Sequence, residues 1–122
     1  MSEIKLKMYQ VRSMKDPLTK LIEKEIKVSL AFRITKLIKV IDQYLEDIEE
    51  LRISLVNKLG VKNEETNTIE VPGKKMKQFS QSMNELLNEE VTIDFTPIPI
   101  AELGDDLELA TKDLMILEPL FV

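Results

Sequence analysis

The chain of 122 residues contains neither cysteine nor histidine. Without them it cannot form a Ser-His or Cys-His nucleophile pair, or a zinc site of the usual nitrogen and sulfur ligands. No imidazole is available to move protons near neutral pH. The three glycines, Gly60, Gly73 and Gly104, do not fall in a phosphate-binding loop pattern. We therefore expect no catalytic residue, no cofactor and no metal site, and a protein that is not an enzyme.

An excess of positive charge and long apolar runs are missing too. The 17 Lys and Arg residues are outnumbered by 22 Asp and Glu, which gives a net charge of −5 and would repel phosphate. Aromatic residues are few, so a nucleic-acid partner is not expected. No run approaches the roughly 18 apolar residues of a membrane span, and residues 1–10 hold no signal-peptide core. Small secreted domains usually need disulfides, so we expect a cytoplasmic location and no membrane partner.

What the sequence does contain is one long amphipathic segment, residues 28–59. Its apolar and aromatic residues recur at alternating spacings of three and four: Leu30, Ile34, Leu37, Ile41, Tyr44, Ile48, Leu51 and Leu55. This spacing predicts a single helix, roughly 45 Å long, that buries one stripe along its whole length. A second apolar column widens the stripe, which indicates a helix in a core. Ser29 is a candidate N-cap, and Gly60 marks the end.

Shorter elements are predicted on both sides of this helix. Alternating apolar residues predict strands, apolar residues at helical spacing predict helices, and polar or turn residues predict loops. The expected strands are residues 4–11, 68–71 and 91–95. The expected helices are a short one starting at Asp16-Pro17, one at residues 74–90, and one at residues 107–117 that is capped by Thr111 or Asp106. Residues 62–67 are expected to be a loop, and Gly104-Asp105-Asp106 is expected to be a turn and not a cation site.

The predicted fold class is α+β and mainly α, in a single domain of residues 1–122. The long helix is expected to pack antiparallel against the helix at 74–90, because each has an apolar face to bury. The strands at 68–71 and 91–95 could pair in parallel through a crossover. Each could equally pair with the N-terminal strand or with a neighbouring subunit.

Charge along the long helix changes sign part-way. Basic residues occupy its first half and acidic residues follow from residue 42. A solvated outer face is the common explanation for such a run. The alternative is a basic patch that binds an acidic partner or a small anionic ligand. Its candidate residues are Lys24, Lys27, Arg33 and Lys36.

The chain ends in three apolar residues, Leu120, Phe121 and Val122. Apolar residues at a chain end are a liability unless they dock on something. We expect them to pack on the chain's own core or on another chain, and we assign them as a candidate interface.

The order of parts resembles a broad group of small phage and prophage proteins of unknown function. The resembling segments are KVSLAFRITKLIK, LVNKLGVKNEETNTIEVP, MNELLNEEVTIDFTPI and DLMILEPLF, which together cover about residues 27–121. None of them is a catalytic motif. The resemblance implies a phage or prophage origin, a location in the bacterial host cytoplasm or on a virion, and no inherited active site.

The resulting hypothesis is a non-enzymatic interaction protein, oligomeric and acting by binding. It would inhibit a host factor or sequester a ligand, with itself, a host protein or a virion protein as partner. The alternative is a virion or assembly component, such as a head–tail or tail accessory subunit that completes a neighbour's sheet or groove. An enzyme based on carboxylates and lysines is disfavoured, because the acidic residues cluster on an exposed helix face and not in a cleft.

Overall fold

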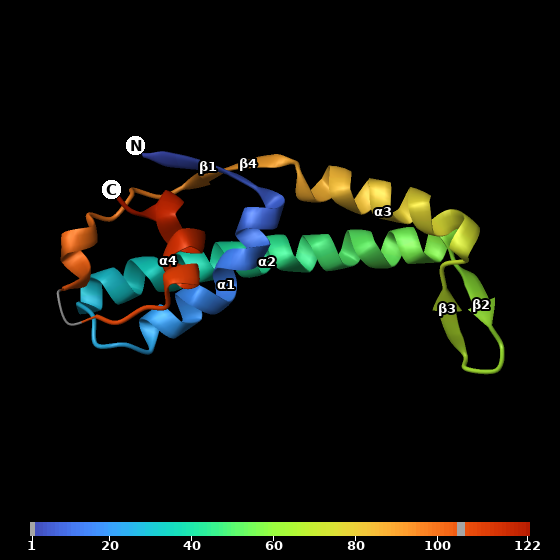
Figure 1. The fold of residues 1–122 in the computed structure, drawn as a ribbon, viewed down its shortest axis with the longest axis horizontal. Coiled ribbons are helices and arrows are strands. Elements are labelled where there is room, and N and C mark those ends of the chain that lie inside the picture. The colour runs from blue at the N-terminus through green and yellow to red at the C-terminus, as the bar shows by residue number, and fades with distance from the viewer. Residues whose placement is uncertain (1, 105–106) are drawn as a thin grey trace.

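A computed structural model describes residues 2–104 and 107–122, and the architecture is α+β and mainly α, as predicted. The elements in chain order are β1 (Glu3–Lys7), α1 (Met8–Ile22), α2 (Val28–Leu59), β2 (Val61–Asn63), β3 (Thr68–Glu70), α3 (Gly73–Leu87), β4 (Glu90–Asp94), the 3-10 turn η1 (Ile100–Leu103), α4 (Thr111–Leu117) and the 3-10 turn η2 (Glu118–Leu120). Figure 1 shows α2 running through the length of the molecule. We call residues 46–89 the arm, and the described residues on either side of it the head.

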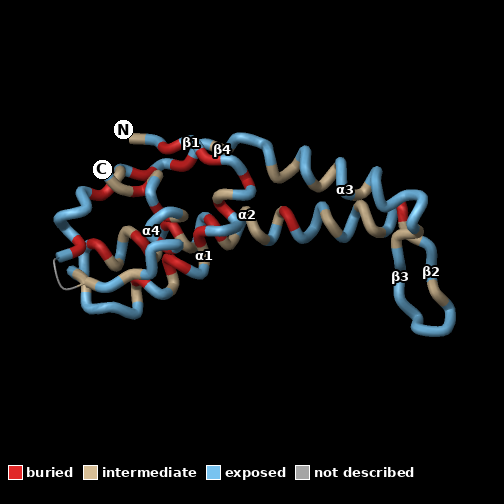
Figure 2. The backbone as a smooth tube through the Cα atoms, viewed as in Figure 1, coloured by how far each residue is buried: buried red, intermediate tan, exposed pale blue. Residues whose placement is uncertain are grey.

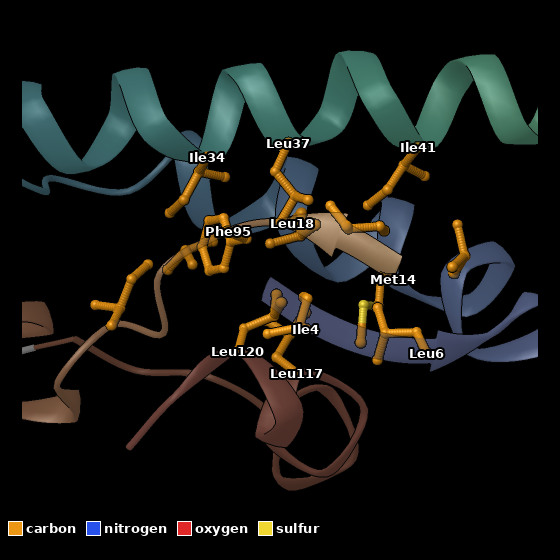
Figure 3. Close-up of a cluster of buried hydrophobic side chains, with 14 of the residues drawn as sticks. Ile4, Leu6, Met14, Leu18, Ile34, Leu37, Ile41, Phe95, Leu117 and Leu120 are labelled. Carbon is orange, nitrogen blue, oxygen red and sulfur yellow. The ribbon is translucent and has the colours of Figure 1, made fainter. Parts of the chain in front are cut away.

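The hydrophobic core lies in the head. It combines one face of α1, the first half of α2, the two strands β1 and β4, and the segments after β4. Figure 2 shows buried residues gathered at this end of the molecule, whereas the arm is largely exposed. Figure 3 shows the α2 side chains Ile34, Leu37 and Ile41 directed toward Phe95 and the strands, with Leu117 and Leu120 closing the core from the other side.

The long helix is confirmed at its predicted bounds, Val28–Leu59. The prediction that its stripe is buried along the whole length is wrong for the part after Ile48, which is itself still buried. Ile34 and Ile41 are fully buried, but Leu51, on the same stripe, keeps 48% of its surface exposed. The reason is that α1 covers only the first half of α2. The second half is covered by α3, which runs antiparallel to it as predicted, and at its very end by β3 (Figure 1).

The N-terminal strand ends earlier than predicted, and α1 begins at Met8 and not at Asp16-Pro17. The backbone N–H of Lys7 donates to Oε1 of Gln10 at 2.8 Å, which stabilises this earlier helix start. Pro17 lies inside α1, where it removes one backbone hydrogen bond. The helix continues through Pro17 because its apolar face packs into the core on both sides of that residue.

The strands form two separate antiparallel pairs within the described residues. β1 pairs with β4, with Ile4 opposite Ile93 and Leu6 opposite Val91. β2 pairs with β3 in a hairpin, so the loop expected at residues 62–67 is shorter than predicted. Parallel pairing of the 68–71 and 91–95 strands is wrong, because the length of α3 separates them (Figure 1). Pairing of the 91–95 strand with the N-terminal strand is confirmed.

Helix ends differ from the predictions at several positions. α2 follows Lys27, with no side-chain cap from Ser29, and α4 follows Ala110, so Thr111 is not its cap. α3 ends at Leu87, and Glu90 belongs to β4. The expected turn and cap at Asp105 and Asp106 lie outside the described residues.

Candidate functional site

The four basic residues assigned to an anion site do not form one surface. Lys24 lines a groove of about 430 Å³ between α1 and α4, together with Lys20 and three acidic residues. One of these acids, Asp113, is buried, and Nζ of Lys20 lies 3.6 Å from its Oδ2. Acidic side chains therefore outnumber basic ones in this groove, which does not favour an anionic ligand. Lys27 does not line it.

Arg33 and Lys36 line a different groove, of about 380 Å³, between α2 and the end of β4. The guanidinium of Arg33 donates to the backbone oxygen of Thr96 and lies 5.3 Å from the centre of the Phe95 ring. Arg33 thus fastens the segment after β4 to α2. Nζ of Lys36 lies 5.2 Å from the Phe32 ring centre. Both cations are engaged within the chain. The four residues predicted to form an anion site are therefore not brought together: Lys24 lies in one groove, Arg33 and Lys36 lie in another, and Lys27 lines neither of them.

The three residues of the predicted interface also separate. Leu120 is 1% exposed and belongs to the head's own core (Figure 3). Phe121 is partly buried and forms an isolated parallel β-bridge with Ile98. The backbone N–H of Ile98 donates to the oxygen of Leu120 at 2.8 Å, and that of Val122 donates to the oxygen of Ile98 at 3.0 Å. These bonds hold the last segment beside residues 98–100, with Val122 exposed.

An apolar groove of about 400 Å³ opens beside this segment, between α4 and the start of η1. Its lining residues are Ile100, Thr111, Leu114, Met115, Glu118, Phe121 and Val122. Met115 and Val122 expose 70% and 76% of their surfaces, and Ile100 beside them exposes 58%, so several apolar side chains of this groove face water together. Sequence reasoning found Phe121 and Val122 but missed Met115, because the α4 periodicity does not show which flank of that short helix is covered.

The arm carries a second apolar surface. No residue of α3 is buried, although its apolar residues recur at helical spacing. Leu51 and Ile53 of α2 and Met76 of α3 each expose nearly half of their side chains. The two helices cover each other along one seam only, so apolar atoms remain in water on both sides of it.

Charge in the arm is paired at one place, between Glu49 and Arg52. Nη2 of Arg52 lies 2.6 Å from Oε1 of Glu49, and Nε of Arg52 donates to Oε2 of Glu49 at 3.0 Å. The hydrogen bond from Arg52 lowers the pKa of Glu49, and the same contact raises the pKa of Arg52. Both groups stay charged at neutral pH.

The described residues, 2–104 and 107–122, contain no group of three or more Asp or Glu side chains placed to hold a metal ion. Among the same residues, no helix combines the length and apolar character that a membrane crossing requires. Comparisons with protein-family models, with curated proteins and with solved structures find no match. The resemblance to phage proteins therefore stays a prediction.

Proposed function

We propose that this protein acts without catalysis, by binding another protein in the apolar groove beside its C-terminal segment. The observation that supports this most is the exposure of Met115 and Val122, which line the groove together with the partly buried Phe121. The volume of this groove, about 400 Å³, falls in the range of roughly 300–1,000 Å³ in which proteins bury small apolar groups. A methionine on the rim adapts to differently shaped apolar groups.

The groove also indicates the chemistry of its partner. Most of its lining is apolar, and Glu118 supplies a carboxylate at one side. A partner segment with one or two apolar anchors next to a Lys or Arg would satisfy both features. Apolar anchors supply most of the binding free energy at such sites, and a rim charge contributes mainly to orientation.

Photocrosslinking tests this proposal in the cell that makes the protein. A photoreactive amino acid at Met115 should yield a covalent adduct with one partner protein. The matched control is the same amino acid at Lys112, which is exposed on the same helix but lies outside the groove. Equal adducts from both positions, or none from Met115, would contradict the proposal.

Affinity measurements with the purified partner complete the test. Met115→Asp and Val122→Asp should each weaken binding at least roughly tenfold, because each places a charge against apolar partner atoms. Both side chains are mostly exposed, so neither variant is expected to unfold. Unchanged affinity in both would exclude the groove.

Following the resemblance to phage proteins, we propose a bacterial host factor as the partner. The alternative, a virion or assembly component, is favoured by the projecting arm, a shape suited to contacts with neighbouring subunits (Figure 1). Mass spectrometry of purified particles separates the two. A stoichiometric amount of this chain in particles would support the assembly role, and its restriction to cell lysate would support the host-factor role.

A further inference from the structure

The charges on the two helices of the arm are divided between its two halves. The near half, next to the head, consists of residues 46–50 and 82–89, and it contains acidic but no basic residues: Glu46, Asp47, Glu49, Glu50, Glu85 and Glu89. The far half consists of the helical residues 51–59 and 73–81, and it contains basic but no acidic residues: Arg52, Lys58, Lys74, Lys75 and Lys77. The hairpin that joins these two segments, residues 60–72, lies outside this division and carries Lys62, Glu64, Glu65 and Glu70. Because α2 and α3 run antiparallel, each half combines segments of both helices (Figure 1).

Helix stability does not explain this division. A helix favours acidic residues in its first turn and basic residues in its last turn. α3 has the opposite arrangement, with Lys74 and Lys75 in its first turn and no basic residue in its last turn. Within the part of the chain that the structure describes, the four lysines of the far half form no ion pair, and only Arg52 contacts an acid. The charges are therefore available to a partner.

We propose that the arm binds the arm of a second copy of this chain, antiparallel, about a twofold axis near residues 50 and 51. In that arrangement the basic far half of each copy lies against the acidic near half of the other. A twofold interface repeats every contact, so both halves are neutralised at once. A parallel arrangement would place the two acidic halves against each other and the two basic halves against each other, and the repulsion between like charges would disfavour it.

The exposed apolar residues of the arm supply the remaining stabilisation. Leu51 lies next to the proposed axis, and Met76 and Ile53 lie in the far half. Two paired arms would cover one apolar flank of each arm in a four-helix layer. Leu51 and Ile53 are about 200° apart around α2, so a single partner arm covers one of the two. The contact is small, because each helical segment of the arm is only about 21 Å long. We therefore expect a dimer in the micromolar range that dissociates in high salt, as small, charged interfaces do.

Charge exchange tests the proposal. The first variant carries Lys74→Glu, Lys75→Glu and Lys77→Glu; the second carries Glu46→Lys, Asp47→Lys and Glu50→Lys. Each variant alone should dissociate at least roughly tenfold more readily than the unchanged chain, because like charges then meet. An equimolar mixture of the two should form a heterodimer, since acidic far halves then meet basic near halves. Sedimentation velocity at low salt measures all three samples.

Recovery in the mixture shows that the single variants are folded, so loss of pairing is not loss of structure. An unchanged chain that stays a monomer at roughly 100 μM, above the range expected for such an interface, would overturn the inference. Single variants that associate as well as the unchanged chain would also overturn it, as would a mixture that stays monomeric. The inference does not depend on the groove, and Met115→Asp should leave the sedimentation of the dimer unchanged.

Discussion

At the residue scale, a few side chains and one glycine fix how the segments meet. Arg33 joins α2 to the segment after β4, and Gly60 lets β3 approach the end of α2. A Cβ at Gly60 would collide with the oxygen of Val56 and with Cγ2 of Ile69. Sequence alone predicted Gly60 as a helix end, but its φ of −83° is available to any residue. The requirement for glycine here is close approach, which depends on a contact that sequence does not show.

Gly60→Ala should therefore loosen the hairpin against the arm and lower the free energy of unfolding by about 1–3 kcal/mol, the usual cost of overpacking. Gly73→Ala is the matched control. A Cβ at Gly73 meets nothing within 4 Å, and alanine favours the start of α3. Urea unfolding followed by circular dichroism measures both variants. Equal stability of the two would contradict the close-approach explanation.

Arg33→Ala should lower the free energy of unfolding by about 1 kcal/mol or more, because the Thr96 oxygen loses a charged donor. Lys36→Ala, on the same helix, should cost less, because the contact of the Lys36 ammonium with the Phe32 ring lies at an exposed aromatic side chain. Thermal denaturation compares the two. A larger effect at Lys36 would show that the contact with Thr96 is not structural.

The Glu49–Arg52 pair predicts a pH effect with a defined sign. Because the pKa of Glu49 is lowered in the folded chain, the ion pair stabilises the arm at pH values above the ordinary glutamate pKa. That contribution is lost as the pH falls through the lowered pKa. Carboxyl NMR titration should show Glu49 titrating at lower pH than it does in Arg52→Ala. Identical titration in both proteins would exclude the pair in solution.

At the scale of elements, the periodicity of the sequence predicted the helices and strands better than it predicted how they pack. The bounds of α2 were predicted correctly because its repeat is unbroken over 32 residues. Which part of that repeat is buried depends on the lengths of α1 and α3, and no local pattern encodes it. The start of α1 was predicted too late for two reasons. Met8 is both the last residue of an alternating apolar pattern and the first residue of the helix, and Asp16-Pro17 has the sequence of a typical helix start. In the candidate groove, Phe121 and Val122 were predicted, whereas Met115 required the packed structure.

The unequal burial of α2 can be measured with two substitutions on one stripe. Ile34→Ala should lower the free energy of unfolding by about 2–5 kcal/mol, as for other deletions from a packed core. Leu51→Ala should cost about 1 kcal/mol or less at concentrations where the chain is monomeric, because Leu51 is half exposed. Comparable losses at both positions would mean that the arm is covered in the monomer.

At the scale of the whole molecule, a packed head carries a projecting arm, and the two present different surfaces. In the two proposals, the groove in the head offers apolar contacts to a partner protein, and the arm offers one acidic and one basic half to a second copy. Separate surfaces allow the chain to pair and to bind a partner at the same time. The sequence predicted an oligomer from the long helix, the possible unpaired strands and the apolar tail. The tail's Leu120 is used in the head's own core, and we propose the arm, which contains the uncovered part of the long helix, as the place of pairing.

The antiparallel pairing of two arms is tested most directly by pulsed EPR on a chain labelled at one position. The chain has no cysteine, so Glu23→Cys at the exposed end of α1 gives a single labelling site in the head. With the axis near residue 50, a rise of about 1.5 Å per residue places the two heads at opposite ends, with labels roughly 60 Å apart. A distance well below ~40 Å would contradict the antiparallel arrangement, because the helical rise keeps the two heads farther apart in it. Such a distance would mean that the heads lie side by side.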